Sequence, residues 1–156
     1  MGHCIQGIIA KTTAISVAEL PDGWPTPVAL SQGYSIIPMF DAVLDGIAKE
    51  QGDGVFDGFT FLDGNLQERL KLFSKGFSLV YLETDYFGGN GSQGAIACES
   101  GQIVFGPESG KIGPINKALS RIGVSRSWTL DEFDALALGK LCGMDDFSDF
   151  AKYETD

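Results

Sequence analysis

The sequence predicts a single α+β domain, with a mostly antiparallel sheet of about five strands and about four helices packed against it. Short β-branched and apolar runs separated by Gly, Pro and Asp predict the strands. Two such runs joined by Ser100-Gly101 predict a hairpin in the C-terminal half, and other segments space their apolar residues as helices do. The length of 156 residues is near the commonest domain size, so residues 1–156 are expected to share one core.

The first elements are expected to be strands. Residues 4–10 form an apolar, β-branched run, and the prolines between 21 and 27 predict a loop around Trp24. Residues 28–30 and 34–37 are then expected as two short strands or one bulged strand.

Two helices are predicted next. A helix from Pro38 or Met39 to about Lys49 would place Phe40, Val43, Leu44 and Ile47 on one face. After an apolar segment over 55–62, Asn65 and Glu68 have the spacing of an N-cap and its reciprocal partner, which predicts a helix that stops at Gly76.

The C-terminal half is expected to hold the central strand, the hairpin and two more helices. Residues 77–87 are apolar on both faces at their start, which is typical of a strand covered on both sides. A glycine-rich loop over 88–92 leads into the hairpin strands 93–99 and 102–105. Helices are predicted over 114–122, with Pro at its first position, and over about 130–141, where Thr129 and Glu132 match a capping box.

Composition limits the function classes. The net charge of −10 argues against nucleic acid as a partner, since phosphate binding needs clustered Lys and Arg. No segment approaches the ~20 apolar residues of a membrane span, and the start lacks the basic region of a secretory signal, so a cytoplasmic protein is expected. The three cysteines, Cys4, Cys98 and Cys142, are expected to be buried thiols rather than a disulfide framework. No metal site and no cofactor is predicted.

Several motifs resemble ligand loops but lack the residues that ligation needs. The run over 88–92 has no Lys-Ser/Thr and is followed by a strand, unlike a phosphate loop. The acids over 53–58 suggest a calcium loop, yet Val55 and Gly64 stand at two of its ligand positions. The sequence has one histidine, His3, so a catalytic Ser-His-Asp arrangement is not expected.

Glu83 and Asp85 are the strongest candidates for a site. Two residues apart on a strand, their carboxylates would point to the same face with Cα atoms about 6.6 Å apart. They could form an acid/base pair or half of a metal site, or they could simply mark a strand that ends in solvent. The sequence leaves both interpretations open.

A motif in the second half resembles a known group of proteins. It consists of Glu83-Thr84-Asp85-Tyr86-Phe87-Gly88-Gly89-x-Gly91-x-Gln93-Gly94, followed by Gly106-Pro107, Gly113-Pro114-Ile115-Asn116 and Asp131-Glu132-Phe133. Over roughly residues 77–140 the chain is similar to small acidic bacterial proteins that resemble immunity proteins of polymorphic toxin systems. The resemblance implies a bacterial setting and a binding role.

We therefore expect a protein-binding domain that neutralises or regulates a basic protein, such as a toxin, rather than an enzyme. Acidic inhibitors act by electrostatic steering and by occluding the partner's cleft. The candidate contact residues are Glu83, Asp85, Tyr86, Phe87, Gly88, Gly89, Gln93, Asp145, Asp146 and Asp149. One alternative is a small enzyme or ligand-binding domain that uses Glu83, Asp85 and Gln93 beside the Gly88–Ser92 loop. Another is a structural subunit of a homo-oligomer.

Overall fold

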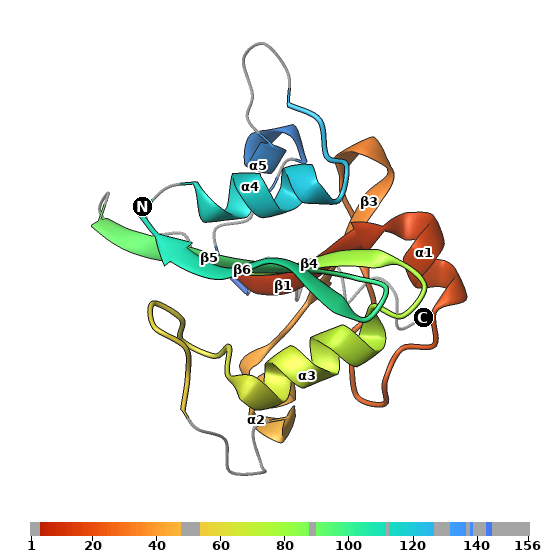
Figure 1. The fold of residues 1–156 in the computed structure, drawn as a ribbon, viewed down its shortest axis with the longest axis horizontal. Coiled ribbons are helices and arrows are strands. Elements are labelled where there is room, and N and C mark those ends of the chain that lie inside the picture. The colour runs from red at the N-terminus through yellow and green to blue at the C-terminus, as the bar shows by residue number, and fades with distance from the viewer. Residues whose placement is uncertain are drawn as a thin grey trace.

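The fold is an antiparallel sheet with helices on both faces (Figure 1). The computed structural model describes residues 4–47, 54–87, 90–111, 113–126, 132–136, 138 and 143–144. The six strands lie in the order β2-β3-β1-β4-β5-β6, and every neighbouring pair is antiparallel. The strands are β1 (Gln6–Lys11), β2 (Val28–Ala29), β3 (Tyr34–Pro38), β4 (Ser78–Phe87), β5 (Asn90–Glu99) and β6 (Gln102–Gly110). The predicted α+β class and antiparallel sheet are confirmed.

The helices form a layer on each side of this sheet. They are α1 (Thr12–Val17), α2 (Asp41–Ile47), α3 (Gly64–Phe73), α4 (Pro114–Arg121) and α5 (Glu132–Ala135). Figure 1 shows α4 and α5 on one face and α2 and α3 on the other. Among the residues described, no helix has the length and apolar content needed to cross a membrane.

The alternation of side chains along the strands fills both layers. On β4, Val80 and Leu82 are fully buried with Leu119 on the α4 side, whereas Leu79 and Tyr81 are fully buried with Leu70 of α3 on the other. Because β4 lies between β1 and β5, both of its faces need apolar residues. The prediction of a central strand is confirmed.

The predicted hairpin is also confirmed. Glu99 of β5 pairs with Gln102 of β6, and Ser100 and Gly101 turn the chain with φ of 50° and 84°. Two positive φ angles suit the right-handed twist of a tight hairpin.

The glycine-rich loop is shorter than predicted. β5 begins at Asn90, which pairs with Phe87, so residues 90–92 belong to a second hairpin instead of a loop. Only Gly88 and Gly89 separate β4 from β5, and both lie outside the described residues. The antiparallel ladder simply continues past residues of poor strand propensity.

In the N-terminal half, the structure decides between two short strands and one bulged strand, and it contains a helix that the sequence did not predict. β2 and β3 are distinct strands, with a 3-10 turn at Ser31–Gly33 between them. Helix α1 directly follows β1 and was not predicted, because its β-branched residues suit a strand and no side chain caps it. Its formation accompanies burial of Ile15, which is 5% exposed.

The next predicted helix starts later than expected. Pro38 is the last residue of β3 and pairs with Gly7, so α2 begins at Asp41. Its expected end at Lys49 lies outside the described residues. Of the helix predicted over 130–141 the structure describes α5, and Thr129 lies outside. Helix α4 begins at Pro114 as predicted.

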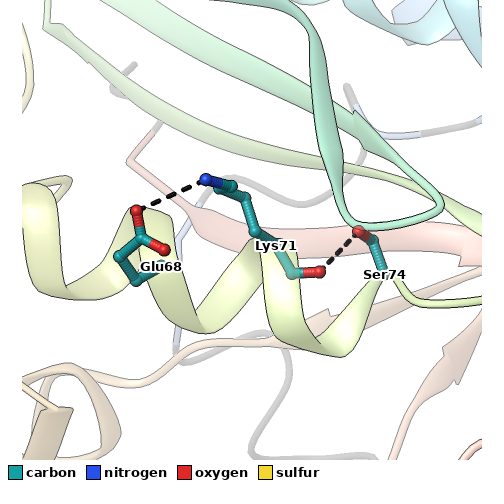
Figure 2. Close-up of polar contacts among 3 residues, drawn as sticks. All are labelled: Glu68, Lys71 and Ser74. Atoms are coloured by element: carbon teal, nitrogen blue, oxygen red, sulfur yellow. Dashed lines mark hydrogen bonds and ion pairs between the residues drawn. The ribbon is translucent and has the colours of Figure 1, made fainter.

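The N-cap of α3 is Asp63 and not Asn65. The Asp63 carboxylate accepts a hydrogen bond from the Leu66 N–H at 2.8 Å, and Asn65 lies inside the first turn. Glu68 pairs with Lys71 at 3.5 Å, and at the helix end the Ser74 hydroxyl donates to the Lys71 carbonyl (Figure 2). The predicted capping pair was therefore placed two residues too late.

Candidate functional site

The ends of β1 and β4 meet at a groove of about 640 Å³, which we call the acidic groove. It lies where the chain enters α2, beside a loop that precedes α3. Its lining residues are Cys4, Gln6, Phe40, Asp41, Ala42, Thr60, Phe61, Glu83, Thr84, Asp85, Gly143 and Met144. Three are acidic, and none of these described residues is Lys or Arg.

Glu83 is held in the wall of the acidic groove. It is 6% exposed, and its carboxylate accepts the backbone N–H groups of Thr60, Phe61 and Leu62 at 2.6, 3.0 and 2.8 Å. The Tyr81 hydroxyl donates a fourth hydrogen bond at 2.8 Å. Donors from two directions thus reach both carboxylate oxygens, and Glu83 joins β4 to the loop over 55–62.

Burial and hydrogen bonding act in opposite directions on Glu83. Burial raises the pKa of its carboxyl, and the four hydrogen bonds lower it, with burial the larger effect. Burial also raises the pKa of Tyr81 well above its usual value, and the neighbouring Glu83 raises it further. Tyr81 therefore acts as a neutral donor.

The loop held by Glu83 is also anchored to the other strands. Phe59, 7% exposed, lies over Gly94 of β5, where a Cβ atom would stand 2.4 Å from its ring. The Ser109 hydroxyl of β6 donates to the Asp57 carbonyl at 3.0 Å. These contacts place Thr60 and Phe61 as a wall of the groove.

The other two acids of the groove are solvent-facing. Asp85 is exposed, and Asp41 is exposed while it accepts a hydrogen bond from the Gln6 side-chain amide at 2.9 Å. Glu83 and Asp85 come from the same strand but differ sharply in environment. Of the pair predicted from the sequence, only Asp85 can present its carboxylate freely to a partner.

Cys4 is an exposed free thiol in the groove, so its predicted burial is wrong. Partial burial raises the pKa of this thiol, and Asp85, Asp41 and Glu83 raise it further. A thiol held in its protonated form is a poor nucleophile. Cys98 is buried as predicted, and burial raises its pKa to about 11. Cys142 lies outside the described residues.

The groove has the chemistry to hold a cationic side chain. No group of three or more His, Cys, Asp or Glu side chains that could hold a metal occurs among the described residues. The groove instead combines carboxylates with the apolar side chains of Phe40, Phe61 and Met144. Such a surface can hold the long apolar stem of Lys or Arg and its charged end together.

Of the other predicted contact residues, the structure describes the side chain of Gln93 alone, and it lies outside this groove. The Gln93 side chain accepts a hydrogen bond from the Ile115 N–H at 2.9 Å, so it caps the start of α4 on the opposite face. Tyr86 pairs through its backbone with Gly91, and the side chains of Tyr86 and Phe87 are not described. Gly88, Gly89, Asp145, Asp146 and Asp149 lie outside the described residues.

Sequence reasoning missed most of the groove. Gln6, Asp41, Phe61 and Met144 come from four separate segments, and none belongs to a recognisable motif. Gly143 forms a β-bridge with Cys4, which brings the neighbouring Met144 to the groove. The Met144 sulfur accepts a hydrogen bond from the Gln6 N–H at 3.4 Å. No local signal could have brought these residues together.

No protein-family model matches the chain, and comparisons with curated proteins and with solved structures give no match.

Proposed function

We propose that this chain is a protein-binding domain that holds a basic side chain of a partner protein in the acidic groove. One observation carries the proposal: Asp41 and Asp85 are exposed beside buried Glu83, without a cationic lining residue among those described. Phe40 and Phe61 supply apolar walls for the stem of the incoming side chain.

The charge of the whole chain supports the same partner. A net charge of −10 attracts basic proteins at long range and raises their association rate. In its most specific form, following the resemblance noted in the sequence, the proposal is an immunity protein that occludes a basic bacterial toxin.

A small enzyme that uses Glu83 and Asp85 has less support. The Glu83 carboxylate already accepts four hydrogen bonds from the protein, so releasing it to take a proton would leave buried donors without an acceptor. Gln93, the third residue of that hypothesis, is engaged with α4.

The test compares two charge-matched variants in affinity capture from the source organism. Asp41→Asn/Asp85→Asn removes two charges at the groove, and Asp57→Asn/Glu99→Gln removes two exposed charges elsewhere. We expect the groove variant to capture at least about tenfold less of a basic protein, because the variant removes charge pairs with that partner. The control should retain it.

Ionic strength provides an independent check. Capture should fall between 0.1 and 1 M salt, because the screening length drops from about 10 to about 3 Å. A captured protein that both variants retain equally, or one that is acidic, would contradict the proposal.

A further inference from the structure

A second groove, of about 500 Å³, lies between α1 and the end of α3, and we call it the apolar groove. Val17 and Leu72 line it and are 87% and 58% exposed, two of the three large hydrophobic side chains recorded as exposed in the described chain. Large exposed apolar side chains gathered at a hollow mark a binding surface.

Three aromatic side chains line the apolar groove. Trp24 meets Phe73 edge-on with ring centres 5.1 Å apart, and Phe73 meets Phe77 in the same way at 5.2 Å. Interlocked rings give a preformed surface, which reduces the entropic cost of binding.

The charges at this groove differ from those of the acidic groove. Arg69 and Lys75 line it, against the single acid Glu19. A segment that combines aromatic anchors with carboxylates would complement this surface.

A third hollow, of about 480 Å³, has lining residues in common with each of the two grooves. It shares Ala42 with the acidic groove, and Trp24 and Arg69 with the apolar groove. Met144, which lines the acidic groove, is the last residue that the structure describes. Neighbouring hollows with shared lining residues therefore lie between this point of the chain and the apolar groove.

The sequence after Met144 has the composition that the apolar groove requires. Residues 145–156 carry aromatic side chains at every third position, Phe147, Phe150 and Tyr153. The same twelve residues hold five acids and one lysine, 1 − 5 = −4. The segment is long enough to reach the apolar groove. Strand β1 runs from Gln6 in the acidic groove to Lys11 beside α1 and rises about 17 Å, whereas an extended chain of twelve residues spans up to about 40 Å.

We propose that the apolar groove is the docking site of the chain's own segment 145–156, with its aromatic side chains on Trp24 and Leu72 and its carboxylates toward Arg69 and Lys75. Occupation of the groove would cover its exposed apolar side chains. This inference uses the apolar groove and does not depend on the proposed binding of a basic partner.

The test follows the accessibility of Trp24 in the full chain. Trp24 and Trp128 are the two tryptophans, so Trp128→Phe leaves Trp24 as the reporter of acrylamide quenching. Phe147→Ala/Phe150→Ala/Tyr153→Ala should raise the quenching constant about twofold, since a docked aromatic segment shields the indole. Ser148→Ala/Thr155→Ala is the control in the same segment and should leave the constant unchanged.

Add-back of the segment tests the site itself. A synthetic peptide of residues 145–156, added to the triple variant, should restore protection saturably at up to a few millimolar, the order of effective concentration that a short tether provides. Leu72→Ser should abolish this effect, while Val55→Ser, which alters a side chain 51% exposed outside the apolar groove, should not.

Three results would overturn the proposal. The triple variant and its control could give the same quenching constant, the peptide could fail to protect Trp24, or protection in the unsubstituted chain could rise with protein concentration. The last result would assign the groove to a second copy of the chain.

Discussion

Glu83 shows how a buried carboxyl can be satisfied by hydrogen bonds in a groove that no described Lys or Arg lines. Four donors, three of them consecutive backbone N–H groups, replace the water that burial removes. Burial nevertheless remains the larger effect on its pKa, so the charged form is less favourable than in water. Glu83 thus holds in place the loop that forms the groove wall.

The raised pKa of Glu83 predicts in which direction the stability of the protein changes with pH. The ordinary pKa of a Glu carboxyl is 4.5, and in the folded protein the pKa of Glu83 is higher, so the unfolded chain loses this proton first as pH rises. The stability that the protonated group contributes is therefore fully present below pH 4.5 and is lost as pH rises through the folded pKa. We expect the wild-type protein to gain stability relative to Glu83→Gln as pH falls from 7 toward 4.5. Urea unfolding of both proteins across this range measures the difference.

Glu83→Gln is the matched reference because it keeps the size of the side chain and removes its titration. A difference that shrinks on acidification would show that hydrogen bonding outweighs burial in setting the pKa of Glu83.

Among the elements, α3 depends on a cap that the sequence pattern misassigned. Asp63 is 8% exposed, and its carboxylate accepts the Leu66 N–H, whereas Glu68 and Lys71 form an exposed pair. A cap satisfies a free N–H of the first turn, whereas a surface ion pair is screened by water. Asp63 should therefore contribute more than Glu68 to the free energy of unfolding.

We predict that Asp63→Ala lowers the free energy of unfolding by about 1 kcal/mol and Glu68→Ala by less than about 0.5 kcal/mol. Denaturant unfolding at pH 7 measures both. Equal losses from the two substitutions would favour the capping pair that the sequence predicts.

At the scale of the whole molecule, one sheet supports two apolar layers. Leu119 of α4 and Leu70 of α3 are each fully buried, on opposite faces of the sheet. Since β4 and β5 contribute side chains to both layers, neither layer has a sheet of its own. That arrangement leads us to expect one cooperative unfolding unit.

Leu70→Ala and Leu119→Ala should each lower the free energy of unfolding by about 2–5 kcal/mol, as for other buried leucines. The double variant should lose the sum within about 0.5 kcal/mol, in a single transition followed equally by circular dichroism and fluorescence. Two separate transitions would show that the layers unfold independently.

Local patterns were enough for the elements whose signals lie within a few residues. The central strand, the Ser100-Gly101 turn and the Pro114 helix start were predicted correctly because turn residues and burial periodicity act over short distances. Where tertiary contacts outweighed local preference, prediction failed: α1 formed from β-branched residues, and β5 extended through Asn90–Ser92.

The sequence by itself determined the class of fold, the alternation that fills both layers, and the acidic charge. Only the tertiary structure decided which acids stay accessible, because the surroundings of Glu83 and Asp85 come from a loop more than twenty residues away and from both ends of the described chain. Burial is a property of the assembled neighbours of a residue, and side chains two positions apart on one strand can therefore differ completely in it.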